Sequence, residues 1–247
     1  MGLPVGAIAN MADKGPIDRA PGKWQIFYIF IRNILKMENA TNARQILLTL
    51  IAFVAWFALI AQFYININSK LNPLPEVIIR YFSYFTLLSN LLVALACTYL
   101  AGRPDGSGFF SRTTVLTAIT VYIVIVGIVY NTVLRSIWDP KGLQKVVDEL
   151  LHVGTPILFL LFWLFFVPKG SLRWKDSFPW MGFPFVYGVC VLLRGSQSGF
   201  YPYPFINLDQ LGWNQTIIHI IGFTLAFLGT GLLFVGIGKR MSRRRSN

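Results

Sequence analysis

Long apolar runs restrict what this chain can fold into. A helix needs about 20 mostly apolar residues to cross a hydrocarbon core ~30 Å thick. Only 13% of the 247 residues are charged, whereas soluble domains carry about 25%. We therefore predict an all-α membrane protein, a bundle of six transmembrane helices. The six spans are expected at about residues 44–64, 79–100, 113–134, 150–167, 178–193 and 216–237.

The remaining sequence divides into two tails and one short amphipathic segment. Residues 1–23 are expected to form a disordered tail, and they contain no apolar stretch typical of a cleavable signal peptide. Residues 24–37 mix bulky apolar side chains with Arg32 and Lys36, which predicts a helix lying on the membrane surface. The transmembrane domain then spans residues 44–237, followed by a basic tail at 238–247.

The basic residues predict the orientation in the membrane. Sixteen of the 22 Lys and Arg residues fall in the two tails and in the loops that share their side. By the positive-inside rule both termini are expected to be cytoplasmic. The net charge of +12 is expected to meet anionic lipid at these flanks, not nucleic acid. The absence of a signal-like stretch fits insertion into a bacterial plasma membrane; the oligomeric state stays open.

Polar side chains gather in the outer halves of the predicted spans. Ionisable and polar groups are costly inside a bilayer and usually face the bundle interior, where they serve a function. The spacing of Ser83, Thr86 and Asn90 places them on one face of the second span. One outward-facing polar cavity is predicted from these three residues together with Tyr130, Asn131, Asp148, His152, Tyr201, Tyr203, Asp209 and His219.

The most informative stretch begins the fourth span, at Asp148–Phe166. Asp148 precedes His152 by four residues, which places both on one helical face. Pro156 lacks the N–H that the His152 carbonyl would accept in an α-helix, so a kink is expected there. A neutral imidazole suits the role of general base, and an acid on its other nitrogen would fix the tautomer.

These groups can be assigned catalytic roles. A hydroxyl needs an adjacent base to become a nucleophile, so Thr86 with His152 forms a candidate pair. Asp148 or Asp209 is the candidate for orienting the imidazole, and Asn90, Asn131 or a tyrosine is the candidate oxyanion donor. Ser83, Tyr130, Tyr201, Tyr203 and His219 are candidate substrate contacts. No cofactor and no metal are expected.

Each of these residues also has a structural interpretation. A threonine in a membrane helix often bonds only its own i−4 carbonyl, and Asn90 is also suited to joining two helices. Tyr201 and Tyr203 fit an aromatic belt equally well. Asp148 has Lys145 and Arg135 as alternative partners in interfacial water.

Two other functions use the same residues. A haem ligated by His152 and His219 would make an electron-transfer protein. A transporter or binding protein for small molecules or lipids would use the same cavity, and helices broken at Pro156 and Pro184 occur in transporters. The sequence shows no inverted repeat that would favour the transporter.

Three short motifs together resemble a known family. They are F-T-L-L-S-N-L-L in the second span, His152 followed by Pro156 in the fourth, and Y-P-Y-P-F before the sixth. In this order they are similar to the androgen-induced-gene and androgen-dependent tissue-factor-pathway-inhibitor-regulating proteins, and most to bacterial six-span "Pr-six-Pr" membrane proteins. The resemblance covers about residues 46–237.

The resemblance implies a membrane threonine hydrolase that cleaves fatty acid esters of hydroxy fatty acids. It places the nucleophile at Thr86 and the histidine at His152. The residues beside His152 are the apolar Leu150, Leu151 and Val153, where the animal proteins carry further polar residues. This departure leaves the identity of the lipid, and the choice between hydrolysis and acyl transfer, open.

Overall fold

The computed structural model describes residues 40–103 and 107–246. The predicted tail at residues 1–23 and the predicted surface helix at 24–37 lie outside the described residues. The chain divides into two units, Met1–Ala43 and Arg44–Asn247. Of the first unit, only the start of helix α2 is described; the rest of α2 and all the other described helices belong to the second unit.

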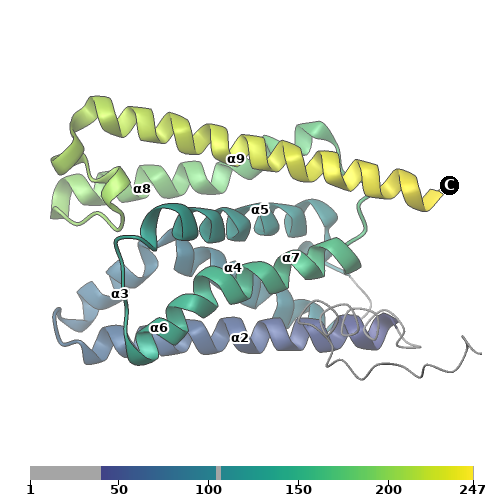
Figure 1. The fold of residues 1–247 in the computed structure, drawn as a ribbon, viewed down its shortest axis with the longest axis horizontal. Coiled ribbons are helices and arrows are strands. Elements are labelled where there is room, and N and C mark those ends of the chain that lie inside the picture. The colour runs from purple at the N-terminus through teal and green to yellow at the C-terminus, as the bar shows by residue number, and fades with distance from the viewer. Residues whose placement is uncertain (1–39, 104–106, 247) are drawn as a thin grey trace, which may run out of the picture. The chain divides into compact units, whose positions relative to one another are not determined.

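The described part of the chain consists of helices joined by loops and contains no strand, as predicted. Five of its helical segments are long and apolar enough to cross a membrane. The pair α3 and α4 makes a sixth if it counts as one span, although its two helices meet at 76°. The main helices (Figure 1) are α2 (Ala40–Asn68), α3 (Leu74–Phe82), α4 (Phe85–Ala101), α5 (Thr113–Val129), α6 (Gly142–Glu149), α7 (Thr155–Phe166), α8 (Gly182–Ser198) and α9 (Leu208–Ser246).

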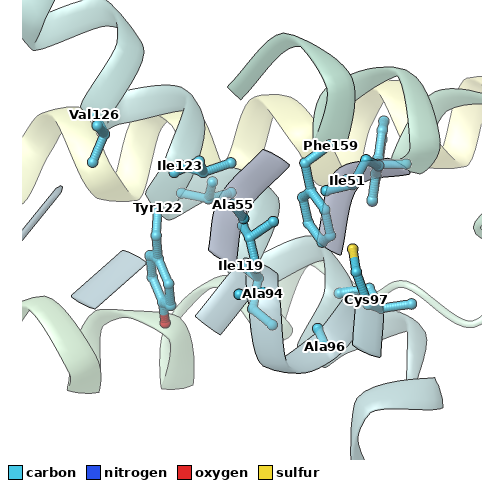
Figure 2. Close-up of a cluster of buried hydrophobic side chains, with 14 of the residues drawn as sticks. Ile51, Ala55, Ala94, Ala96, Cys97, Ile119, Tyr122, Ile123, Val126 and Phe159 are labelled. Carbon is cyan, nitrogen blue, oxygen red and sulfur yellow. The ribbon is translucent and has the colours of Figure 1, made fainter. Parts of the chain in front are cut away.

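The buried core combines side chains of α2, α4, α5, α7 and α9. Phe159 of α7 is fully buried and lies beside Ile51 of α2 and Cys97 of α4 (Figure 2). Several buried positions on α4 are small: Ala94, Ala96 and Cys97 are all at 0% exposure. Because lipid tails are as apolar as the side chains, membrane helices associate through close packing, and small residues permit it.

The second predicted span is broken where the sequence predicted one continuous helix. Ser83 and Tyr84 separate α3 from α4, and Tyr84 has an extended backbone with φ −90° and ψ 122°. Ser83 therefore does not share a helical face with Thr86 and Asn90. A break inside a membrane is tolerated when other groups bond the freed backbone. Here the Tyr187 hydroxyl donates to the Ser83 carbonyl at 2.9 Å.

Two helices contain a π-helical turn that the sequence did not predict. One, η3 (Tyr130–Leu134), continues α5, and the other, η4 (Leu150–Gly154), joins α6 to α7. In η4 the N–H of Thr155 bonds the carbonyl of Leu150, five residues back. In this register the Leu151 carbonyl faces Pro156, which has no N–H. The sequence predicted that the His152 carbonyl would lack a helical donor. Because of the π turn, the carbonyl without a helical donor is that of Leu151 instead.

Candidate functional site

A cavity of 690 Å³ lies between α5, α8, α9 and the start of α4. Its walls are mostly aromatic and aliphatic, which is typical of sites for apolar ligands. Five lining residues carry hydroxyls: Thr86, Tyr130, Tyr187, Tyr203 and Thr224. The cavity is also lined by Phe185 and Val189 of α8, which are 71% and 41% exposed. An apolar ligand therefore meets apolar side chains both inside the cavity and at its outer wall.

Thr86 and Tyr203 form a hydroxyl pair in the cavity wall. Thr86 occupies the first turn of α4, where backbone N–H groups lack helical partners. Its N–H donates to the Tyr203 hydroxyl at 3.2 Å, and its Oγ1 lies 3.2 Å from the same oxygen. One of the two hydroxyl protons is used between them, so the other remains free to donate to a ligand. Burial raises the pKa of Tyr203 to about 12, so its hydroxyl is neutral at physiological pH.

The Y-P-Y-P-F loop that carries Tyr203 is held at three points. Tyr203 itself contacts Thr86, and its ring stacks on Phe205 at 5.0 Å. The Phe205 carbonyl lies 2.7 Å from Nδ1 of His219 on α9. Tyr201 fills the space over Gly195 of α8, where a Cβ would lie 2.1 Å from the ring. The loop thus ties α8, α9 and the start of α4 together.

Asn90 connects the start of α4 to the helix that carries His152. Its fully buried Nδ2 donates to the Thr86 carbonyl at 2.9 Å and to the Leu151 carbonyl at 3.1 Å. The second bond supplies the donor that Pro156 cannot provide. Thr86 and Leu151 therefore have carbonyl oxygens within hydrogen-bond distance of one nitrogen. His152, next in the chain to Leu151, is held near the threonine by this amide.

His152 belongs to a buried group with Asp148 and Tyr130. Its Nδ1 lies 2.9 Å from the Asp148 carbonyl oxygen and 3.4 Å from the Oδ1 of the same residue. The Tyr130 hydroxyl donates to Oδ2 of Asp148, and its ring stacks on the imidazole with centroids 4.0 Å apart. Asp148 is 6% exposed, so it does not sit in interfacial water. Arg135, a suggested alternative partner, instead bonds Glu149 at 2.6 Å.

The predicted pair of Thr86 and His152 is close but not in contact. Among the described residues, the hydroxyl partner of Thr86 is Tyr203, and the imidazole partner is Asp148. Tyr130 lines the cavity and His152 does not. Direct proton transfer between Thr86 and His152 would therefore require the Thr86 hydroxyl to move away from Tyr203 and toward the imidazole.

The other candidate residues lie apart from this group. Ser83 bonds the Ile79 carbonyl and receives a bond from Arg194. Asn131 is exposed and bonds the Gly127 carbonyl of its own helix. Asp209 is exposed at the start of α9. His219 holds the loop through the Phe205 carbonyl and is not among the cavity-lining residues.

Sequence reasoning missed most of the cavity wall. Phe85, Tyr187, Phe223 and Phe227 line it, but in the sequence they are indistinguishable from aromatic residues that face lipid. Gly127 is a sequence feature that could have indicated the close packing of α5 against His152. A Cβ at Gly127 would lie 3.2 Å from the His152 carbonyl oxygen.

The described residues contain no group of three or more His, Cys, Asp or Glu side chains arranged to hold a metal ion. No family model, curated protein or solved structure matches the chain. The apolar helices of the chain indicate a multi-pass membrane protein.

Proposed function

We propose that the protein is an intramembrane hydrolase that cleaves an ester bond of a lipid drawn from the bilayer. The observation that supports this most is the Thr86–Tyr203 hydroxyl pair in the wall of a 690 Å³ apolar cavity. An acyl chain would fill the cavity, and its ester carbonyl would accept the free hydroxyl proton. The basic flanks would bind anionic lipid, with both termini in the cytoplasm of a bacterial cell.

In the proposed reaction Thr86 Oγ1 attacks the ester carbonyl carbon. Its proton passes to Nε2 of His152, and the Tyr203 hydroxyl donates to the developing oxyanion. The leaving alcohol takes the proton from the imidazole, and an acyl-threonine forms. Water then attacks the acyl group and gives a proton to His152, the bond to Thr86 Oγ1 breaks as Oγ1 takes that proton back, and the fatty acid is released. Thr86 also lies at the N-terminus of α4, where the helix dipole favours negative charge.

Thr86→Ala and Thr224→Val provide a matched test. Both hydroxyls line the cavity, but Thr224 donates to the Ile220 carbonyl of its own helix at 2.8 Å. Turnover of a fatty acid ester by purified protein in nanodiscs is the measurement. We expect Thr86→Ala and His152→Ala to abolish turnover and Thr224→Val to retain it. Folded Thr86→Ala protein with wild-type turnover would refute the assignment of the nucleophile.

A carrier or binding protein for an apolar molecule is the second candidate. The observation that favours it is that the Thr86 hydroxyl is paired with a tyrosine instead of the imidazole. A carrier predicts that the wild type binds a fatty acid ester without converting it, and that Thr86→Ala moves it across a proteoliposome membrane at the wild-type rate. For a haem protein the geometry is less suited, because neither His152 nor His219 lines the cavity.

A further inference from the structure

Tyr130 is placed to act on His152 without itself reacting. Its ring covers one face of the imidazole at a centroid distance of 4.0 Å and an interplanar angle of 14°. Its hydroxyl donates to Asp148 Oδ2, while Oδ1 of that carboxylate lies 3.4 Å from Nδ1 of His152. One side chain therefore contacts both the imidazole and the carboxylate beside it.

We propose that Tyr130 is a positioning residue: its stacked ring fixes the orientation of His152, and its hydroxyl holds the Asp148 carboxylate beside Nδ1, where the carboxylate strengthens the preference for the tautomer that the Asp148 carbonyl sets. The catalytic meaning of this role rests on the proposed hydrolase function, since it assigns His152 as the base. The structural claim, that Tyr130 and Asp148 hold the imidazole of His152 in place, depends only on the observed contacts. Sequence reasoning had placed Tyr130 among the substrate contacts.

The tautomer follows from the partners of Nδ1. The Asp148 carbonyl oxygen only accepts hydrogen bonds, so the Nδ1 atom 2.9 Å from it must carry a proton. Nε2 is then the nitrogen of the neutral ring that can accept a proton. General-base histidines in hydrolases also carry the proton on Nδ1 beside a carboxylate and accept with Nε2; here Nδ1 bonds the Asp148 carbonyl, and the Asp148 carboxylate lies 3.4 Å away.

Both π turns contribute to this geometry. Tyr130 begins η3 at the end of α5, and His152 lies in the middle of η4. A π turn changes the direction of the side chains that come after it, and such turns are frequent at functional sites. Gly127, one turn before Tyr130, lets α5 approach the His152 carbonyl closely. The stacked pair thus depends on irregular backbone in two neighbouring helices.

The charged groups around the pair are few among the described residues. Arg135 lies over the Tyr130 ring, with its guanidinium carbon 5.3 Å from the ring centroid. Its charge is balanced by Glu149, which accepts two hydrogen bonds from it at 2.7 and 2.6 Å. Among the described residues, the acidic side chain beside the imidazole is Asp148. Tyr130 holds Asp148 by a hydrogen bond to its carboxylate.

Nuclear magnetic resonance of 15N-histidine-labelled protein in nanodiscs tests the positioning role directly. The chain has two histidines, so His219→Gln assigns the signals and His219 serves as an internal control. In the wild type we expect the two nitrogens of His152 to show the well-separated shifts of one fixed tautomer. Tyr130→Phe keeps the stacked ring but removes the bond to Asp148. We expect the two shifts to move toward each other in this variant and in Asp148→Asn.

Tyr187→Phe is the matched control for Tyr130→Phe. Tyr187 also lines the cavity, but its hydroxyl donates to the Ser83 carbonyl, away from the histidine. The His152 shifts should be unchanged in this control, and the His219 shifts in both variants. Unchanged His152 shifts in folded Tyr130→Phe protein would overturn the positioning role.

Turnover of a fatty acid ester separates the positioning role from the proposed function. If Tyr130 positions His152 and the protein is a hydrolase, Tyr130→Phe should lower kcat by up to about 100-fold, which is within the contribution of a general base. KM should stay near the wild-type value. The dependence of kcat on pH should also change, because His152 loses its fixed partner. Altered His152 shifts with an inactive wild type would support the positioning role and reject hydrolysis.

Discussion

The hydroxyl of Thr86 and the hydroxyl of Tyr203 lie 3.2 Å apart, although 117 positions separate the two residues in the chain. The same tyrosine accepts the Thr86 backbone N–H. A single side chain from the loop before α9 therefore satisfies an open N–H of α4 and holds the candidate nucleophile. The same contact therefore stabilises the start of α4 after the break and positions the hydroxyl proposed to react in the cavity.

The Tyr203 hydroxyl should make the protein sensitive to high pH. Its pKa is raised to about 12 by burial, above the usual value of about 10. The folded state therefore favours the neutral phenol, and this contribution to stability is complete below about pH 10 and is lost as the pH rises toward 12. We expect the melting temperature of the wild type to fall more steeply than that of Tyr203→Phe between about pH 9 and pH 11.5. If the melting temperatures of the two proteins fall in parallel as the pH rises, the Tyr203 hydroxyl does not contribute to the pH dependence of stability.

Asn90 should be a large contributor to helix association. Its Nδ2 supplies a donor to the Leu151 carbonyl next to Pro156, so Asn90→Leu leaves that carbonyl buried without a partner. We expect a loss of about 0.6–1.7 kcal/mol in the free energy of unfolding, the range of side-chain hydrogen bonds in membrane proteins. Titration with a denaturing detergent measures it. Asn131→Leu, at an exposed position bonded to its own helix, should change stability much less.

Gly127 should not tolerate a side chain. A Cβ at this position would lie 3.2 Å from the His152 carbonyl oxygen and 3.3 Å from Cβ of Pro156. Gly127→Ala would push α5 away from α7, at a cost of about 1–3 kcal/mol. Gly229→Ala in α9, where a Cβ would meet nothing within 4 Å, is the control. Equal thermal stability of the two variants would contradict the close approach of the helices.

Gly195 should control the position of the loop that carries Tyr203. A Cβ at Gly195 would overlap the Tyr201 ring, at 2.1 Å from Cε1, so Gly195→Ala must displace the loop. We expect lower turnover of a fatty acid ester together with a lower melting temperature, because Thr86 loses its tyrosine partner. Tyr201→Ala in the Gly195→Ala background removes the overlap and should restore part of the stability. No recovery would show that the overlap is not the cause.

The limits of sequence reasoning are clear at Asp148 and Ser83. The helical spacing of Asp148 and His152 predicted their proximity, and the structure places them together. Spacing on one helix could not reveal that Tyr130 contacts both, because that contact needs α5 to pack against η4. Ser83 was assigned to the same face as Thr86, but the backbone breaks between them. The break is stable because side chains distant in the sequence bond the freed backbone.

The sequence by itself determined that this is a helical membrane protein and which parts of it are apolar enough to cross. The bilayer imposes that result, because about 20 apolar residues are needed per span and backbone groups must be bonded within the helix. The tertiary structure decided which hydroxyl faces which partner, where the helices break or form π turns, and where the cavity lies. Those features depend on side chains packing across helices, and a pattern along one helix does not contain that information.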